Sequence, residues 1–573
     1  MRHDYLQLLT LHPKPPPGLA PNAPKPISAT VRFNGFRALV TVCPLLYSAL
    51  SIGRQNTPQR SGWSLLPLTN RSFFAQSLRA QILCGLLIAL ATAGLTSCHS
   101  SNYLAYKFPT YTFANRPVPP SKLANRVMIA VTANGTSTGS LQIVDAKRDL
   151  RSNIQNTITS FSIAGYASGF PNLILNFPAE ITGFVYSNAQ GDIQIVNYGK
   201  EAVTGAAGTF PAKSTGLAIP PNGGHIYSAE ETIGQLGVID NATGRTFGLV
   251  LPNVFQVVVN QGDSVVLAMV RNSNTIYRLV KLNDNQFPTS TAAIVATGAA
   301  DCEPFNLPVY CVVPVNTGTH TNAFDRPTGA YFSLDGSTVY VLNCGAECGG
   351  TTSSVTYLQQ GALQYNNIPK TVPDASAFTN QVLVPGGVTA AVANGTTLYV
   401  SGQQLQSDGL FAGNLSIINL ATNTVTGQYS ISDGTHSKML FADNNTLWIG
   451  SQFCATGERA HQASLGVTTQ AANYNCLTRF DLGALTVSIV PFVTQGSATA
   501  VVQFPNTNQN QYYYGDLTGL CWVQSFNKVY TAYGGQVHVF STVDGSEIDN
   551  KNVTVQGTAL DVAYMDAITD ADN

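Results

Sequence analysis

The stretch GAYFSLDGSTVYVLN, residues 329–343, contains two short apolar segments on either side of an Asp-Gly pair. β-Branched and aromatic residues are frequent in both segments, as is typical of strands. A tight hairpin needs positive φ angles in its turn, and glycine and aspartate tolerate these angles well. The stretch therefore predicts a β-hairpin.

The same pattern recurs along the chain from residue 126 onward. A second pair of short apolar segments usually follows it, so that one unit spans about 40 residues before insertions. Other copies are GLAIPPNGGHIYSAE (216–230) and GVTAAVANGTTLYVSG (387–402), and weaker copies are SKMLFADNNTLWIGS (437–451) and GLCWVQSFNKVYTAY (519–533). Four short antiparallel strands at this period are typical of a propeller blade. The sequence predicts an all-β fold, a single β-propeller of four-stranded blades over residues 126–566.

Three segments resemble a known repeat. FSLDGSTVYVLN (332–343) is similar to the "SPDG…VYVtN" core of the YVTN-type β-propeller repeat family, and VIDNATGRTFG (238–248) and IINLATNTVTG (417–427) are similar to its second half. The resemblance implies a propeller, commonly with seven blades, and no shared catalytic residues.

The two ends of the repeat region complement each other. The first unit (126–149) lacks an innermost strand, whereas GTALDVAYMD (557–566) resembles an innermost strand with no blade after it. Pairing these segments would close the ring and remove an exposed sheet edge. We count eight blades on this basis, and seven remains the alternative if one weak unit is an insertion.

The segment before the repeats resembles an export signal. Residues 82–97 form an apolar run that follows Arg71 and Arg79 and ends in small residues. The sequence LTSC (95–98) resembles the lipobox of bacterial lipoproteins, which implies that Cys98 is lipidated and becomes the mature N-terminus. A membrane-spanning helix, or a buried helix with a chance cysteine, is the alternative.

This interpretation divides the chain into five parts. They are a non-native or disordered leader (1–67), a lipoprotein signal peptide (68–97), the lipidated cysteine with a tether (98–125), the propeller (126–566) and a disordered tail (567–573). The expected location is the cell envelope, at the outer membrane or the periplasmic face, with the membrane as a partner through the N-terminal lipid.

The charge content and the motifs of the sequence narrow the classes of function to consider. Only 10% of the residues are charged, against about 25% in a typical soluble domain, and the formal net charge is −1. No basic face for phosphates follows Cys98, so we expect no nucleic-acid partner. No motif assigns a catalytic residue, a metal or a cofactor.

Seven cysteines follow Cys98. In an exported protein, pairs within one insertion are expected to form disulfides that hold loops with little core of their own. The predicted pairs are Cys302 with Cys311, Cys344 with Cys348 and Cys454 with Cys476, which leaves Cys521 as a free buried thiol. Metal binding by CGAEC (344–348) is the alternative for one pair.

Two regions could bind a ligand. The first is a set of polar insertions, at 284–326, 344–385, 453–475 and 491–516, the last of which contains Tyr512–Tyr514 and could contact a protein or a carbohydrate. The second is the central funnel, where the residues just ahead of innermost strands are the candidate ligand-binding residues Arg326, His436 and Asp516. Blade-to-blade hydrogen bonds are the alternative role for these three residues.

The sequence thus favours an exported, lipid-anchored binding or scaffold module outside the cytoplasm. An enzyme on the same fold, such as a lactonase-like hydrolase or a quinone-dependent dehydrogenase, is the alternative, because propellers carry many unrelated functions.

Overall fold

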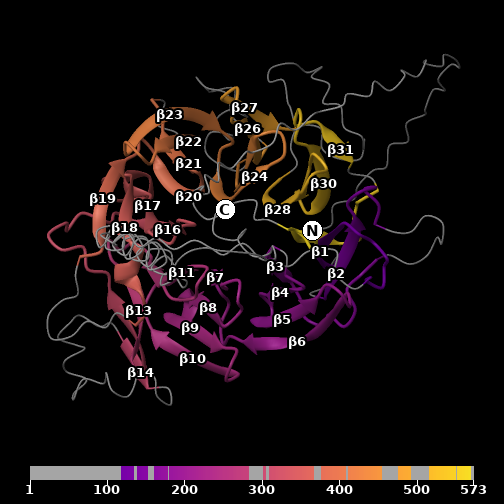
Figure 1. Ribbon diagram of the computed structural model, residues 1–573, viewed down its shortest axis with the longest axis horizontal. Coiled ribbons are helices and arrows are strands. Elements are labelled where there is room, and N and C mark those ends of the chain that lie inside the picture. The colour runs from indigo at the N-terminus through magenta and orange to yellow at the C-terminus, as the bar shows by residue number, and fades with distance from the viewer. Residues whose placement is uncertain are drawn as a thin grey trace, which may run out of the picture. The chain divides into compact units, whose positions relative to one another are not determined.

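The computed structural model contains eight β-sheets that form one ring (Figure 1). All described residues belong to one compact unit of the chain. The structure describes residues 118–133, 138–151, 161–178, 180–282, 301–304, 309–366, 376–407, 411–454, 475–491, 515–549 and 552–568. The fold is the predicted β-propeller, and the blade number is eight.

Blades 1 to 4 are numbered in chain order, and blade 1 also takes the last strand. Blade 1 contains β1 (Arg126–Thr132), β2 (Gly139–Asp145) and β32 (Thr558–Tyr564). Blade 2 contains β3 (Pro171–Leu175), β4 (Thr182–Ser187), β5 (Asp192–Asn197) and β6 (Ala202–Thr209). Blade 3 contains β7 (Gly216–Ala218), β8 (His225–Glu230), the 3₁₀ helix η4 (Glu231–Ile233), β9 (Gln235–Asp240) and β10 (Arg245–Val250). Blade 4 contains β11 (Val254–Val259), β12 (Val266–Val270), β13 (Ile276–Leu282), β14 (Asp301–Pro304) and β15 (Val309–Pro314).

Blades 5 to 8 complete the ring. Blade 5 contains β16 (Pro327–Phe332), β17 (Thr338–Asn343), η6 (Gly345–Cys348), β18 (Ser354–Gln359), η7 (Gln360–Leu363) and β19 (Phe378–Leu383). Blade 6 contains β20 (Gly387–Asn394), β21 (Thr397–Leu405), β22 (Phe411–Asn419) and β23 (Thr424–Ile431). Blade 7 contains β24 (Thr435–Ala442), β25 (Thr446–Gln452), β26 (Leu477–Asp481) and β27 (Thr486–Val490). Blade 8 contains β28 (Leu517–Val523), β29 (Lys528–Tyr533), β30 (Gln536–Ser541) and β31 (Glu547–Asp549).

Two blades depart from the simple four-strand order. In blade 1 the outer position next to β2 is taken by residues 161–163, where the Ile143 amide donates to Phe161 O (2.9 Å) and the Ile163 amide donates to Leu141 O (3.0 Å). In blade 4 the order is β11-β12-β13-β15-β14, so the predicted insertion contributes both the fourth strand, β15, and an additional edge strand, β14.

The hydrophobic core lies between the blades. Side chains of a strand alternate between its two faces, and both faces of each blade meet a neighbouring blade. Eight clusters of buried apolar side chains fill the eight contacts between adjacent blades; Val127 and Val539 belong to the cluster between blades 1 and 8. Because every blade is buried on both faces, its strands are more continuously apolar than those of a sheet with one wet face.

The innermost strands share one irregularity. A β-bulge interrupts the pairing of the innermost strand in seven blades, all except blade 3. A bulge leaves one residue unpaired and increases the local twist, so it changes which side chains face the ring axis. In three of these blades, the residue directly after the bulge is Lys438 (β24, blade 7), Gly519 (β28, blade 8) or Asp561 (β32, blade 1).

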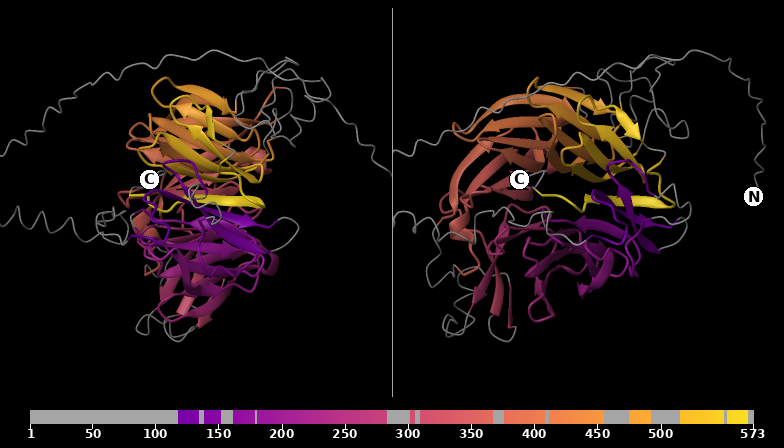
Figure 2. Two further views of the ribbon diagram at one scale, coloured as in Figure 1. Left: turned by 90° about the vertical axis from the view of Figure 1, so that its right-hand side faces the viewer. Right: turned by 45° about the vertical axis from the view of Figure 1, so that its right-hand side comes forward.

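The two ends of the described chain close the ring, as predicted. β32 pairs with β1 in antiparallel register, with Val127 opposite Tyr564 and Thr132 opposite Thr558. In both views of Figure 2 the yellow C-terminal strand runs beside the indigo and magenta N-terminal strands. This pairing supplies the innermost strand that the first repeat lacks.

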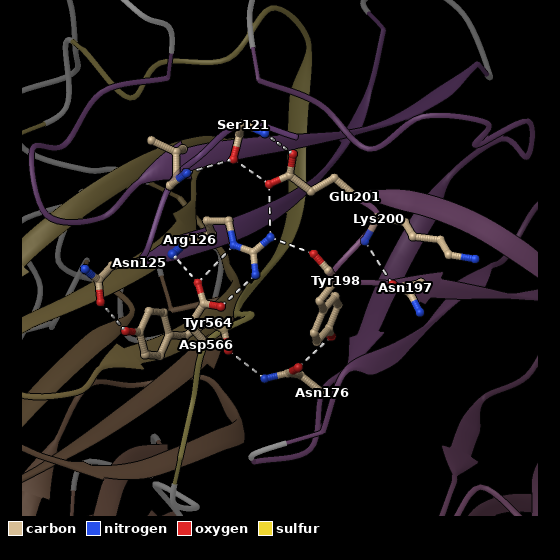
Figure 3. A network of polar contacts seen from close by, with 11 residues as sticks. Ser121, Asn125, Arg126, Asn176, Asn197, Tyr198, Lys200, Glu201, Tyr564 and Asp566 are labelled. Atoms are coloured by element: carbon tan, nitrogen blue, oxygen red, sulfur yellow. Dashed lines mark hydrogen bonds and ion pairs between the residues drawn. The ribbon is translucent and has the colours of Figure 1, made fainter. Parts of the chain in front are cut away.

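A buried ionic network lies beside this closure (Figure 3). The guanidinium of Arg126 contacts Asp566 through Nη2 (2.7 Å) and Nε (3.1 Å), and contacts Glu201 Oε1 of blade 2 through Nη1 (3.0 Å). Nη1 also donates to Tyr198 O (2.6 Å), and Ser121 donates two hydrogen bonds to Glu201. Burial by itself lowers the pKa of Arg126, but Asp566 and Glu201 outweigh it and raise the pKa above its usual value.

The three predicted disulfides are present. Cys302–Cys311 joins directly opposite residues of β14 and β15, Cys344–Cys348 encloses η6, and Cys454–Cys476 joins the end of β25 to the start of β26. Because Cys344 and Cys348 are bonded to each other, the alternative of a metal site in this segment is wrong. Cys521 is free and buried, as expected.

Candidate functional site

A central cavity of about 290 Å³ lies at the inner edges of four consecutive blades. Its lining residues come from or directly follow β24 of blade 7, β28 of blade 8, β32 of blade 1 and β3 of blade 2. The cavity extends from the middle of these strands to residues beyond their C-terminal ends, among them Pro178, Gln524 and Ala567. Most of the lining residues are apolar, but polar atoms form more of the exposed wall than apolar atoms do. The two oppositely charged side chains in the wall are Lys438 and Asp561.

Lys438 and Asp561 occupy equivalent positions, immediately after the bulge of their strands. The Lys438 ammonium lies 3.5 Å from Asp561 Oδ1. The Asp561 carboxylate is 2% exposed, whereas the Lys438 side chain is 30% exposed. The two partners therefore differ in their accessibility to a molecule in the cavity: the Asp561 carboxylate is buried in the wall, and the Lys438 ammonium is partly exposed.

The Asp561 carboxylate is held mainly by backbone groups. Oδ2 accepts a hydrogen bond from the Ile174 amide (2.8 Å) of blade 2, and Oδ1 accepts one from the Val562 amide (3.0 Å). Burial nevertheless raises the pKa of Asp561, because it outweighs the opposing effects of the Lys438 charge and the two amides. Asp561 thus joins the innermost strands of blades 1 and 2.

Gly519 is the equivalent residue of the blade between them. A Cβ atom on Gly519 would lie 2.7 Å from Asp561 Oδ1 and 2.7 Å from Val562 N, closer than real Cβ contacts allow. A glycine is therefore required where β28 and β32 approach each other. The atom that this Cβ would approach, Asp561 Oδ1, is the same one that the Lys438 ammonium contacts.

Cys521 and Trp522 of β28 also line the cavity. Burial, together with the Asp561 charge, raises the pKa of the Cys521 thiol far above its ordinary value. The nucleophilic form of cysteine is the thiolate, so this thiol is unreactive at neutral pH. In the part of the chain that the structure describes, no group of three or more His, Cys, Asp or Glu side chains is arranged to hold a metal ion.

The three funnel residues predicted from the sequence do not line this cavity. Arg326 and Asp516 directly precede β16 and β28, and His436 is the second residue of β24. They lie at the start of their strands, whereas the cavity begins at the middle and extends beyond the C-terminal ends.

Each of the three makes a contact with the preceding blade. The Arg326 amide donates to Asn274 Oδ1 of blade 4 (3.2 Å), and Asp516 Oδ1 accepts from the Phe453 amide of blade 7 (2.7 Å). The carbonyl oxygen of His436 accepts from Thr389 Oγ1 of blade 6 (2.9 Å). These are the blade-to-blade hydrogen bonds considered as the alternative role, and ligand binding by the three residues stays a prediction.

His436 is fully buried and neutral at pH 7. Its Nε2 lies 2.7 Å from Ser432 O. Burial lowers the pKa of His436 to about 4, against a smaller opposing effect of the Ser432 carbonyl. A histidine in this state is a structural group and does not exchange protons near neutral pH.

Sequence reasoning missed Lys438 and Asp561, although a signal for both exists. GTHSKMLFAD (434–443) and GTALDVAYMD (557–566) share their first two residues and their last, and they carry opposite charges at the fifth position. A charged residue in the middle of an apolar innermost strand is unusual, because such strands are buried. The spatial pairing of the two could not be read from the chain.

The other predicted sites lie outside the described residues. These are the lipidation site Cys98 and the tyrosines Tyr512–Tyr514. Among the residues that the structure does describe, none of the helices is long and apolar enough to cross a membrane.

The chain is similar to known proteins in structure alone, and only distantly. No protein-family model matches the chain, and no curated protein matches it in sequence. Among solved structures, the dihydro-heme d1 dehydrogenase NirN in complex with DHE matches with a TM-score of 0.44 and 12% identity, over 81% of this chain and 83% of that one. The C-terminal WD40 domain of Sif2 matches with a TM-score of 0.42 and 10% identity, over 72% of this chain and 91% of that one. Hydrazine synthase of Kuenenia stuttgartiensis matches with a TM-score of 0.38 and 11% identity, over 73% of this chain and 94% of that one. At these scores the likenesses carry no argument about function.

Proposed function

We propose that this chain is an exported, lipid-anchored β-propeller that acts as a binding or scaffold module in the cell envelope. The observation that carries the proposal is the set of three disulfides, each of which lies within one blade. Structural disulfides persist in oxidising compartments and are rare where glutathione and thioredoxin keep thiols reduced. The pairing of six cysteines, with Cys521 left as a buried thiol, favours a location outside the cytoplasm.

The anchor is proposed from the sequence LTSC (95–98), in which Cys98 carries the lipid. Two or more acyl chains on one cysteine hold a protein stably at a membrane, whereas a single chain holds it only marginally. An anchored propeller would present its loops and its central cavity to the envelope.

Binding is proposed in preference to catalysis on the chemistry of the cavity. Asp561 already accepts two backbone hydrogen bonds, and the thiol of Cys521 stays protonated because burial raises its pKa. A general acid or base must reach the substrate, and the buried Asp561 carboxylate does not. A nucleophile must be activated, and the protonated Cys521 thiol is not. A rigid ring with a small cavity that has both polar and apolar walls is suited to hold a ligand or a partner.

Cell fractionation of a Cys98→Ala variant tests the anchor. We expect the natural chain in the membrane fraction and the Cys98→Ala chain released from it. Cys84→Ala is the matched control, because Cys84 lies in the apolar run and should leave membrane attachment unchanged. Membrane attachment of Cys98→Ala equal to that of the control would contradict the proposal.

Mass spectrometry under non-reducing conditions tests the compartment. Protein isolated from cells with thiols blocked at lysis should contain the Cys302–Cys311, Cys344–Cys348 and Cys454–Cys476 linkages. Alkylation of these six cysteines as free thiols would place the chain in a reducing compartment and overturn the export proposal.

A further inference from the structure

We propose that the central cavity binds a small organic monocarboxylate with an apolar body, whose carboxylate pairs with the ammonium of Lys438. This inference rests on the proposed function as a binding module and names the ligand class of its cavity. It follows from which polar groups of the wall are already satisfied and which are not.

Lys438 has unused hydrogen-bonding capacity. A lysine ammonium carries three N–H donors. Among the described residues its polar contact is with Asp561 Oδ1 at 3.5 Å, which exceeds the usual 2.7–3.2 Å of an N–H···O bond. Because the side chain lines the cavity and is 30% exposed, the remaining donors are available to a molecule inside it.

Most of the other polar groups of the wall have partners. The exceptions are the buried indole N–H of Trp522, which has no hydrogen-bond partner among the described residues and can also donate to an anion, and the exposed hydroxyl of Ser437. Asn176 donates to Tyr564 O (2.7 Å) and accepts from the Tyr198 hydroxyl (2.5 Å), and Gln524 accepts from the Ile568 amide (2.8 Å). The Asp561 carboxylate accepts two backbone amides and is almost fully buried, so it is closed to a ligand cation. The recognition group of the cavity is therefore a cation, and its complement is an anion.

An anion bound near Asp561 would favour the neutral form of this residue. Burial raises the pKa of Asp561, and an added anion nearby would raise it further. The charged or titratable side chains that line the cavity with it are Lys438 from β24, Cys521 from β28 and Tyr564 from β32, and β3 contributes none. Proton uptake by Asp561 would leave Lys438 as the single charge of the site.

The cavity limits the size and polarity of the ligand. Its volume of about 290 Å³ is at the lower end of ligand pockets, which range over about 300–1,000 Å³. The apolar part of the wall is formed by Ile174, Met439, Leu440, Leu520, Val562 and Ala563. Such a wall accommodates a short aliphatic chain or a single aromatic ring, and a charge-assisted bond to Lys438 would orient it.

Calorimetric titration of the full-length protein tests the proposal, with hexanoate as the probe. Hexanol and hexylamine serve as probes with the same chain and a different head group. We expect hexanoate to bind at least ten times more tightly than either. Equal binding of hexanol would show that the apolar body alone is recognised, and tighter binding of hexylamine would show that Asp561 is the recognition group. Either result would overturn the proposal.

Variants of Lys438 identify the partner of the carboxylate. Lys438→Met should weaken hexanoate binding at least tenfold while hexanol binding is unchanged, and Lys438→Arg should retain hexanoate binding. Lys200→Met is the matched control, because Lys200 is exposed on the far side of blade 2 from the cavity strands and should have no effect. If Lys438→Met fails to fold, the double variant Lys438→Met/Asp561→Asn removes both charges. A folded double variant that binds hexanoate as the natural chain does would overturn the proposal.

The two proposals fail in different experiments. Absence of any hexanoate binding to the natural chain would overturn the ligand class and leave the fractionation and disulfide results as they stand. Loss of the anchor or of the disulfides would overturn the proposed function and leave the carboxylate titration as it stands.

Discussion

Arg126 and Asp566, 440 positions apart in the chain, form a two-point ionic contact in which Nη2 and Nε of the guanidinium lie 2.7 and 3.1 Å from the two carboxylate oxygens. The backbone amide of Arg126 also donates to Asp566 Oδ2 (2.8 Å). Arg126 is the first residue of β1, and Asp566 lies two residues after β32 ends. The contact joins the two ends of the ring next to their strand pairing.

Arg126→Met should strongly destabilise the fold. Both partner carboxylates are buried, with side-chain exposures of 2% for Asp566 and 5% for Glu201, so the variant would leave two buried charges without their cation. Removing one partner of a buried pair costs about 3–5 kcal/mol. The free energy of unfolding from urea titration measures this loss.

Arg148→Met is the control for Arg126. It removes a guanidinium that is 69% exposed and paired with Asp145 at 3.3 Å, and pairs of this kind contribute about 0–1 kcal/mol. Equal losses of stability for the two variants would show that the network beside the ring closure has no special role.

Glu230→Gln should make the protein more stable than the natural chain at neutral and alkaline pH. Glu230 is fully buried, neither carboxylate oxygen has a hydrogen-bond partner among the described residues, and burial raises its pKa from 4.5 to about 7. The folded protein therefore binds more protons than the unfolded chain between these two values. Stability falls as the pH rises through this window, by about 3 kcal/mol, and stays low above it.

Urea titrations at several pH values test this. The natural chain and Glu230→Gln should have similar stability near pH 4, and the variant should be more stable near pH 8. Glu231→Gln is the neighbouring control, because Glu231 pairs with Arg271 at the surface and its pKa is lowered by that pair. A gain near pH 8 in the control, or none in Glu230→Gln, would contradict the prediction.

Gly519→Ala should destabilise the ring at the cavity. The added Cβ atom would meet Asp561 Oδ1 and the backbone of Asp561 and Val562 at 2.7–2.8 Å, so β28 and β32 would have to separate. Overpacking of this kind costs about 1–3 kcal/mol. Thermal unfolding measures the effect, and Gly205→Ala in β6, where an added Cβ atom meets nothing within 4 Å, should be neutral or slightly stabilising.

The disulfides should differ in their contribution to stability. The Cys454–Cys476 bond encloses 22 positions and the Cys344–Cys348 bond encloses four. In the chain-entropy model these loops correspond to about 3 and about 2 kcal/mol. Replacing each pair by alanine should therefore lower the free energy of unfolding more for the longer loop, and the reverse order would show that the model does not describe this protein.

Local patterns predicted most of the architecture. The Asp-Gly turn between the apolar segments of 329–343 identified a hairpin, and its recurrence identified the blades, because a hairpin depends on residues that are close in sequence. The three disulfides were predictable for the same reason, since each pair lies within one insertion. The closing strand 557–566 was predictable because it resembles an innermost strand but no blade follows it, while the first repeat lacks an innermost strand.

The sequence by itself determined the all-β fold, the pairing of β32 with β1 and the three disulfides, and it favoured eight blades with seven as the alternative; the structure decided for eight. Only the tertiary structure decided where the cavity lies and which residues form it. Lys438 and Asp561 are 123 positions apart and meet because the ring brings blades 7, 8 and 1 together. Strand patterns report which segments pair, since pairing follows local periodicity, but the position of a side chain on the ring axis depends on bulges and on the packing of neighbouring blades.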